Sequence, residues 1–227
     1  MTWILLYYGR HISNTEFAIW IFVFFIAWIF VKPKKRPIYD ATRESIEPIS
    51  HKLGLKFTPA YKIGGTQYSS ETSGEISGCK FRLYFPGTQL TRSNWISHTY
   101  FSFECGSIYN YRFSLCGETL LTKVADKLWQ KEIKTGNAAF DDLYNFTSSD
   151  HEFTLTLLST EDIQTLADNA TVNVPRIDFD SGRLTFREDG RITNDADAER
   201  IQAFINVLSK VAGKLKQRSE ELNASKV

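Results

Sequence analysis

Cys79-Lys80-Phe81-Arg82-Leu83-Tyr84-Phe85 alternates between apolar side chains at the odd positions and polar or amphipathic ones at the even positions. The segments 99–105 and 111–116 repeat this alternation. Successive side chains of a β-strand point to opposite faces, so a period of two predicts strands with one buried face. Pro86-Gly87 and segment 106–110 are typical turn sequences, and we expect the three strands to form an antiparallel meander.

Two further patterns, closer to the C-terminus, complete a predicted α+β fold. Segments 176–179 and 183–186 alternate on either side of Ser181-Gly182, which predicts a hairpin because glycine accepts the positive φ of a tight turn. After a cap at Asn194 or Asp195, apolar residues recur at helical spacing and predict one long helix that packs on a mainly antiparallel sheet. Its apolar stripe consists of Ile201, Phe204, Ile205, Leu208, Val211, Ala212 and Leu215.

Shorter elements are predicted between these patterns. In chain order they are a helix from Asp40 or Thr42 to Gly54 with a kink or first turn at Pro48, a strand at 55–57, strands at 132–136 and 143–148 around a loop, a helix capped by Asp150, and a helix from Thr160 to Asn169. The segment from Leu120 to Trp129 is compatible with either a helix or a strand. We expect one soluble α+β domain over residues 38–219 and a disordered tail over 220–227, because an unpacked chain end frays.

The N-terminal part of the chain contains an apolar run from Phe17 to Val31 without charge, Gly or Pro. Extended back to Ile12, this run gives an α-helix of about 30 Å, the thickness of the hydrocarbon core of a bilayer. The alternative is a buried helix of a soluble protein, but such a helix rarely lacks a polar stripe. We therefore expect a single transmembrane helix at residues 12–31, anchored by Phe17, Trp20, Phe24, Trp28 and Val31.

A basic juxtamembrane cluster follows the apolar run and consists of Lys32, Lys34, Lys35 and Arg36. Because the charges come after the run and no Ala-x-Ala pattern closes it, a cleaved signal peptide does not fit. Basic flanks stay on the cytoplasmic side. The cluster therefore predicts a single-pass protein of the cell (inner) membrane, with the N-terminus outside and the domain in the cytoplasm. Residues 1–37 comprise the N-terminal segment, the membrane helix and a stiff Pro-containing spacer.

Charge and cysteine content narrow the possible partners and compartment. The chain has 27 Lys and Arg against 26 Asp and Glu, a net charge of +1. Because the positive excess lies in residues 1–37, the remainder is mildly acidic, which argues against nucleic acid as a partner. Alternation places Cys79 and Cys105 on the buried face of their strands and Cys116 on the other. Three cysteines without C-x-x-C spacing indicate neither a disulfide framework nor a zinc site, and they fit a reducing compartment.

Several short stretches occur together in the C-terminal half of the chain. They are 136–141, 146–150, Leu157-Leu158-Ser159-Thr160, and the 177–186 hairpin followed by the amphipathic helix. In these stretches the chain resembles a family of bacterial membrane-anchored proteins with a soluble domain of unknown function. The resemblance implies a domain tethered behind one or two hydrophobic helices. It implies no activity.

No pattern of reactive side chains indicates an enzyme. His11, His51, His98 and His151 lack metal-ligand spacing, and the glycines at 64–65 and 74–78 lack the Lys-Ser/Thr of a phosphate loop. No serine stands in a nucleophile elbow. Carboxylates at Asp141-Asp142 and Asp150 could hold a divalent ion or act as acids, but solvated loop residues are the simpler interpretation. The sequence predicts no catalytic residue, no cofactor and no metal site.

Three functional hypotheses follow. The first is a membrane-tethered cytoplasmic interaction domain that contacts the bilayer through its N-terminal helix and a protein partner through its sheet or C-terminal helix. The second is a binder of a lipid or another apolar ligand in a pocket between the sheet and that helix. The third is an enzyme, for which His98, His151 and Asp141 are the candidate side chains. A closed interior would count against the second, and a scattered placement of these residues against the third.

Overall fold

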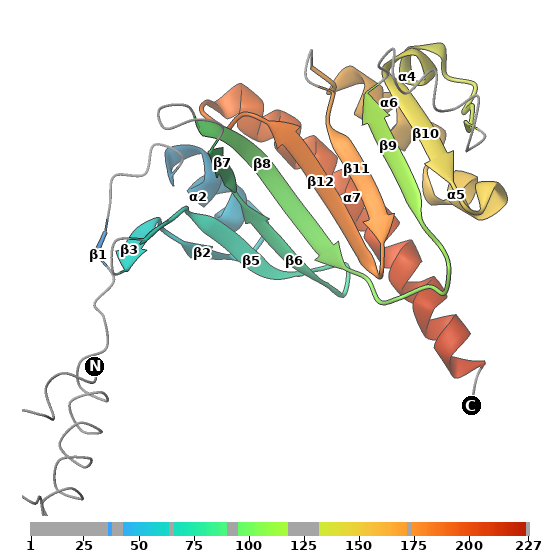
Figure 1. Cartoon of the computed structure of the whole chain (residues 1–227), viewed down its shortest axis with the longest axis horizontal. Helices are drawn as coiled ribbons and strands as arrows, with labels where there is room; N and C mark the ends of the chain where they lie inside the picture. The colour runs from blue at the N-terminus through green and yellow to red at the C-terminus, as the bar shows by residue number, and fades with distance from the viewer. Residues whose placement is uncertain are drawn as a thin grey trace, which may run out of the picture.

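The computed structural model describes residues 36–37, 43–63, 66–89, 95–117, 132–171 and 174–225. They form the predicted α+β fold around a large antiparallel sheet (Figure 1). Its strand order is β10 (Tyr144–Ser148), β9 (Phe113–Gly117), β11 (Arg176–Asp180), β12 (Arg183–Asp189), β8 (Trp95–Glu104), β6 (Cys79–Tyr84), β5 (Glu71–Ile76) and β2 (Lys56–Thr58), with β7 (Gly87–Gln89) also paired to β8. A smaller sheet joins β1 (Arg36–Pro37), β3 (Tyr61–Ile63) and β4 (Thr66–Tyr68).

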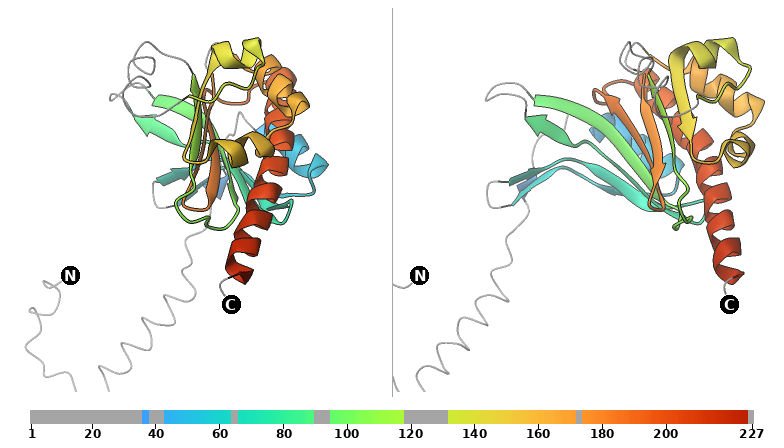
Figure 2. Two further views of the ribbon diagram at one scale, coloured as in Figure 1. Left: turned by 90° about the vertical axis from the view of Figure 1, so that its right-hand side faces the viewer. Right: turned by 45° about the vertical axis from the view of Figure 1, so that its right-hand side comes forward.

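The helices cover one face of the large sheet (Figure 2). They are α2 (Arg43–Lys52), α4 (Ala138–Leu143), α5 (His151–Leu157), α6 (Thr160–Asp168) and α7 (Asp195–Ala224). The apolar stripe predicted for α7 is confirmed, because all its residues are buried. The rings of Phe186 on β12 and Phe204 on α7 lie 4.9 Å apart and join the two layers. The core therefore lies between the sheet and its helices.

The order of the central strands differs from the predicted meander. β8 pairs with β6 as expected, but β9 does not lie beside β8 because the β11–β12 hairpin is inserted between them. Leu184 and Phe186 of β12 lie opposite Phe103 and Phe101 of β8. The rings of Phe101 and Phe186 stack with centroids 4.4 Å apart. Alternation predicts which face of a strand is buried, but it does not predict which strand is its neighbour.

The hairpin itself is confirmed. Its two-residue turn consists of Ser181 (φ 49°) and Gly182 (φ 81°), and positive φ at both positions matches the type I′ turn that continues the strand twist. A Cβ on Gly182 would lie 2.8 Å from the carbonyl carbon of Gly106, so glycine is required here. The carbonyl of Gly182 also accepts the N–H of Cys105 at 2.8 Å. The turn is thereby fixed against the chain that leaves β8.

The segment before β10 also differs from the prediction. Only an isolated bridge at Glu132 remains of the strand that we expected at 132–136. The carboxylate of Asp141 accepts the N–H of Thr135 at 2.9 Å and that of Gly136 at 3.1 Å. These contacts turn the chain into the short helix α4, which takes the place of the expected loop.

Three of the predicted helix starts are confirmed, whereas the start predicted at Asp40 or Thr42 lies outside the described residues. The carboxylate of Asp150 accepts the N–H of Phe153 at 3.1 Å at the start of α5. Ser159 and Asp162 form a reciprocal capping box at the start of α6. Asn194 caps α7 by accepting the N–H of the third helical residue. Such caps satisfy N–H groups that have no partner within the helix.

The end of α7 differs from the expected disordered tail, because the helix continues through residues 220–224. The hydroxyl of Ser219 donates to the carbonyl of Ser107 at 3.0 Å, and Leu222 packs against the core. These tertiary contacts hold the last turns of the helix, and a reading of local sequence does not reveal them.

The predicted membrane anchor, with Phe17, Trp20, Phe24, Trp28 and Val31, lies outside the described residues. So do Lys32, Lys34 and Lys35 and the segment 120–129. Arg36, the last residue of the basic cluster, starts β1 and pairs with Lys62 of β3. Within the ranges that the structure describes, no helix combines the length and the apolar composition needed to cross a bilayer.

Candidate functional site

The face of the large sheet opposite to the helices is covered by no described helix (Figure 2). On the central strands, side chains that point to this side alternate with core residues such as Phe81 and Phe101. We call this surface the open face. It includes Arg82, Tyr84, Tyr100, Glu104, Arg176, Asp178, Arg183 and Arg187. One face of the sheet is thus apolar and buried, whereas the other presents charges, hydroxyl groups and tyrosine rings.

A first groove on the open face has a volume of about 300 Å³ and lies over β5, β6, β8 and β12. The guanidinium of Arg82 donates to the carboxylate of Glu71 at 2.6 Å and lies 4.7 Å above the ring of Tyr84. That ring is 5.0 Å from the ring of Tyr100. Burial raises the pKa of Tyr100, so its hydroxyl stays neutral and can both donate and accept. The groove therefore combines fixed aromatic surface with a paired cation.

A second groove, of about 430 Å³, lies over β9, β10 and β11. Arg176 donates through Nε to Asp178 at 2.6 Å, and this hydrogen bond raises the pKa of the guanidinium. The hydroxyl of Ser114 donates to the other oxygen of the same carboxylate at 2.7 Å. The carboxylate of Asp178 is therefore shared between Arg176 and Ser114. The exposed side chain of Arg112 also lines this second groove.

Arg187 lies between the two grooves, opposite Tyr100 of β8 and Arg176 of β11. Like charges on opposed residues of neighbouring strands repel each other. The guanidinium of Arg187 donates to Nε2 of His98 at 3.3 Å. In the part of the chain that the structure describes, it makes no ion pair with a carboxylate. Arg187 therefore lies opposite a second cation, Arg176, without a carboxylate of its own among the described residues.

His98 links Arg187 to Asp189. Its ring is almost fully buried, at 5% exposed, and Nδ1 lies 2.8 Å from the carboxylate of Asp189. A guanidinium can only donate, so Nε2 must accept from Arg187 and Nδ1 must carry the proton that goes to Asp189. Both ring nitrogens are therefore occupied by the protein's own side chains. In this arrangement neither ring nitrogen is available to a substrate or a metal ion.

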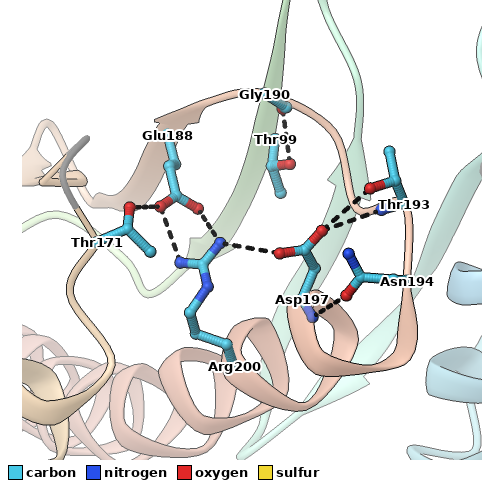
Figure 3. Close-up of polar contacts among 8 residues, drawn as sticks. All are labelled: Thr99, Thr171, Glu188, Gly190, Thr193, Asn194, Asp197 and Arg200. Atoms are coloured by element: carbon cyan, nitrogen blue, oxygen red, sulfur yellow. Dashed lines mark hydrogen bonds and ion pairs between the residues drawn. The ribbon is translucent and has the colours of Figure 1, made fainter.

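A buried polar junction joins the inward side of β12 to α7 (Figure 3). Glu188 is 5% exposed and accepts two hydrogen bonds from the guanidinium of Arg200, at 2.8 and 2.9 Å. The hydroxyl of Thr171 donates to the same carboxylate at 3.1 Å. Asp197 lies 4.0 Å from the guanidinium on its other side. The parallel, two-point geometry is the strongest form of an Arg–carboxylate pair.

Neighbouring contacts in Figure 3 fix the chain between β12 and α7. Asn194 accepts the N–H of Asp197 at 2.8 Å, and the hydroxyl of Thr193 donates to the Asp197 carboxylate at 3.2 Å. The hydroxyl of Thr99 donates to the carbonyl of Gly190 at 3.0 Å. The polar groups drawn in this junction bond to one another, so its geometry serves to position α7 rather than to hold a ligand.

Near this junction, the hydroxyl of Tyr144 differs from these hydrogen-bonded polar groups. It is buried, and among the residues that the structure describes it has no hydrogen-bond partner. Burial raises the pKa of Tyr144, and the nearby charge of Glu188 acts in the same direction. A buried hydroxyl that is not hydrogen-bonded lowers the stability of the fold.

The remaining residues considered from the sequence are not brought together. His51 lies in the last turn of α2, His151 starts α5, and Asp141 is occupied by the backbone of α4's entry turn. Asp150 caps α5. Among the residues described, no group of three His, Cys, Asp or Glu side chains is placed to hold a metal ion.

Between the described strands and helices lies a small internal space. Phe113 and Leu115 of β9 and Leu208 and Val211 of α7 line a space of about 10 Å³, which is room for roughly one water molecule. An acyl chain would require the helices to separate from the sheet.

Sequence reasoning did not single out the residues of the open face. The alternation pattern did place Arg82, Tyr84 and Tyr100 on the outward side of their predicted strands. What the sequence could not show is that Arg176 and Arg187 lie opposite each other, because that register depends on which strands pair. A search for outward arginines and tyrosines across all predicted strands would have found these residues of the open face. It would not have shown which of them lie next to one another.

Comparisons with known proteins add little. A scan of protein-family models found no match, and a search of curated proteins found none. Among solved structures, the chain is similar to the mycobacterial trehalose monomycolate transport factor A, TtfA, with 10% sequence identity and a TM-score of 0.39 over 75% of this chain and 95% of that one. A similarity at this level indicates no shared function.

Proposed function

We propose that this chain is a membrane-tethered binding module that docks an acidic segment of a protein partner on its open face. In this proposal residues 12–31 span the membrane and the domain lies on the cytoplasmic side. The apolar run and the basic cluster that follows it support the tether and its orientation. The proposal assigns no reaction and no cofactor to the chain.

The observation that carries the proposal is the position of Arg187 opposite Arg176. One carboxylate, that of Asp178, is shared between Arg176 and Ser114. An Asp or Glu of a partner placed between the two guanidinium groups would relieve their repulsion and accept charge-assisted hydrogen bonds, each worth about 1.5–3 kcal/mol.

The grooves on either side give such a segment further contacts. Tyr84 and Tyr100 offer rigid aromatic surface, which is favoured at protein interfaces because few rotatable bonds are lost. The two grooves, about 300 and 430 Å³, are each large enough for one or two side chains of an extended segment. Charge sets the register of the partner, and the aromatic rings add apolar contact.

Site-specific photo-crosslinking in intact membranes tests the proposal. A photoreactive amino acid at Thr185, in the middle of the open face, should give a discrete adduct with another protein. The same probe at Gln217, exposed on the helical side of the fold, should give none. Substitution Arg187→Glu should reduce the Thr185 adduct by about tenfold or more, because it replaces an attraction by a repulsion. The matched reversal Lys52→Glu on α2 should leave it unchanged.

Two results would contradict the proposal. One is an equal yield of adducts from Thr185 and Gln217, which would show no preference for the open face. The other is an adduct at Thr185 that Arg187→Glu does not weaken, which would exclude the acidic partner.

Binding of a lipid or another apolar ligand is a second candidate, favoured by the lining of the small space between the sheet and the helices, in which Thr154 is the one polar residue. It requires α5 and α7 to move away from the sheet. Titration with a fluorescent fatty acid should then saturate, and Leu158→Trp, which enlarges a half-buried lining residue, should weaken it. Leu155→Trp on the exposed side of α5 is the control. Absence of saturable binding would dismiss this candidate.

A further inference from the structure

Cys79 and Cys105 face each other where β6 begins and β8 ends. Lys80 of β6 lies opposite Glu104 of β8, so one further step along this antiparallel register brings Cys79 opposite Cys105. The N–H of Cys105 donates to Gly182, on the β12 side. A strand residue directs its N–H and C=O to the same side, so Cys105 forms no ladder bonds toward β6. Non-hydrogen-bonded pairs of this kind have Cα atoms about 4.5 Å apart, within the range that a disulfide spans.

The two thiols share one buried environment under α7. Cys79 and Cys105 are 1% and 2% exposed, and the thiol of Cys79 also lies 3.5 Å from the carbonyl of Ala212. The hydrogen bond from the Cys105 thiol lowers the pKa of Cys79, and the charge of Lys216 acts in the same direction against the effect of burial. The same thiol contact and burial raise the pKa of Cys105. The ammonium of Lys216 donates to the carbonyl of Gly78, next to Cys79, at 2.6 Å, and a positive charge at this position favours a thiolate at Cys79.

A groove reaches Cys105 and the two neighbours of Cys79 in the chain, Gly78 and Lys80. Its volume is about 650 Å³, and Cys105, Gly106, Lys216 and Ser219 contribute to its lining. The groove lies at the end of β8, where the chain turns away from the sheet. Strand ends open locally at lower free energy than strand centres. Because both thiols are almost fully buried, exchange with a reagent requires such a local opening.

We propose that Cys79 and Cys105 form a reversible disulfide by exchange with a small disulfide such as oxidised glutathione. The thiolate of Cys79 attacks one sulfur of the reagent, a mixed disulfide forms, and one glutathione thiolate leaves. The Cys105 thiol then loses its proton and attacks the Cys79 sulfur, which releases the second glutathione. In total two protein thiols are oxidised to one disulfide, and one oxidised glutathione is reduced to two glutathione molecules. This inference does not depend on the proposed docking function.

The native fold and the unfolded chain favour different pairings, and this difference gives a sharp test. The loop between Cys105 and Cys116 is shorter than that between Cys79 and Cys105. In an unfolded chain, loop-closure entropy therefore favours the 105–116 pair by roughly three- to fourfold. The full chain, purified in detergent, is incubated with oxidised glutathione in native buffer and, separately, in concentrated urea. After acid quenching and alkylation of free thiols, linked peptides are measured by mass spectrometry.

We expect the native sample to contain the Cys79–Cys105 link with Cys116 alkylated, whereas the urea sample is enriched in Cys105–Cys116. The variant Cys116→Ser should form the native link at an unchanged rate. The variants Cys79→Ser and Cys105→Ser should form none, with circular dichroism as the check on folding. Excess dithiothreitol should reverse the link. The oxidised chain should also melt at a higher temperature than the reduced chain, by on the order of 5 °C.

The inference is overturned if both thiols stay alkylatable in native buffer at a glutathione disulfide concentration that links the unfolded chain. It is also overturned if the native sample contains mainly links to Cys116. Should a single-cysteine variant fail to fold, the comparison of native and denatured wild type and Cys116→Ser decides the question without it.

Discussion

Glu188 occupies a position that the alternation of β12 gives to a core side chain, because it continues the inward row of Leu184 and Phe186. A buried carboxylate costs several kcal/mol unless a cation and hydrogen bonds compensate it. Arg200 supplies both from the first half of α7. The pair connects the end of the central hairpin to the helix at one defined position. We therefore expect it to fix the position of α7 on the sheet.

Removal of one partner from this pair should be costly. Arg200→Met leaves the Glu188 carboxylate buried without its cation, and we expect the free energy of unfolding to fall by about 3–5 kcal/mol. The double variant Glu188→Leu/Arg200→Met removes both charges and should recover most of this loss. Urea unfolding of both single variants and the double variant gives the coupling energy. A double variant as unstable as Arg200→Met would show that packing, and not the unpaired charge, causes the loss.

Asp162 should give the domain a measurable acid sensitivity. Burial acts to raise its pKa, but the hydrogen bonds from Lys210 and Ser159 outweigh this effect and lower it. The folded state then binds fewer protons than the unfolded state, so the stabilisation is present above about pH 4 and is lost as the pH falls further. Asp162→Asn should cost about 1–2 kcal/mol at pH 7 and progressively less from pH 4 down to pH 2.

The control for this comparison is Asp168→Asn, on the exposed side of the same helix. It should change stability little and without this pH dependence. Unfolding curves of the three proteins from pH 7 to pH 2 provide the measurement. A constant difference between wild type and Asp162→Asn across that range would show that the ionised carboxylate makes no special contribution.

Among the elements, the β11–β12 hairpin determines the order of the sheet, and its turn is the most restricted point of the backbone. Gly182 combines a positive φ with a close approach to the carbonyl carbon of Gly106. Gly54, which follows α2, also has a positive φ of 65°, but a Cβ there would meet nothing within 4 Å. Substitutions at the two glycines therefore distinguish the energetic cost of backbone strain from the cost of a steric clash.

We expect Gly182→Ala to destabilise the domain by more than about 2 kcal/mol, because it adds a clash with backbone atoms to the strain of positive φ. Gly54→Ala should cost about 1 kcal/mol, from strain alone. Thermal and urea unfolding of the two variants measure the difference. Equal losses would mean that the turn moves away from Gly106 at no cost.

Local patterns predicted these elements to different extents. The 176–186 hairpin, the caps at Asp150 and Asn194 and the α7 stripe were correct, since each depends on residues close together in the chain. Helix α4 was missed because it is too short to show a period and is created by the contacts of Asp141 with the preceding turn. The last turns of α7 were missed because they depend on packing against distant residues.

At the scale of the whole molecule, stability should be concentrated in the centre of the sheet. β8 and β12 have neighbours on both sides and contribute the fully buried rings of Phe101, Phe103 and Phe186, whereas the short strand β2 lies at an edge. Amide hydrogen exchange should therefore be slowest in β8, β12 and the middle of α7 and fastest in β2. Exchange measured by mass spectrometry tests this order. Protection in β2 equal to that in β12 would contradict it.

The candidate site was less predictable than the fold. The sequence indicated strands with a polar side, but Arg176 and Arg187 lie opposite each other only because β12 pairs with β11, with β8 on its other side. The same applies to Cys79 and Cys105, which looked like isolated core thiols although their strands bring them opposite each other. Sites of this kind depend on strand pairing over long distances in the chain, about which local periodicity contains no information.

The division of the sheet into a covered face and an open face has a consequence for how this domain can evolve. Substitutions on the open face leave the packing of α2, α5, α6 and α7 on the other side unchanged. Surface changes of this kind usually alter stability by less than about 0.5 kcal/mol. Selection can therefore change the surface chemistry of the open face one residue at a time, and with it the binding specificity that we propose for it, while the core that maintains the fold stays the same.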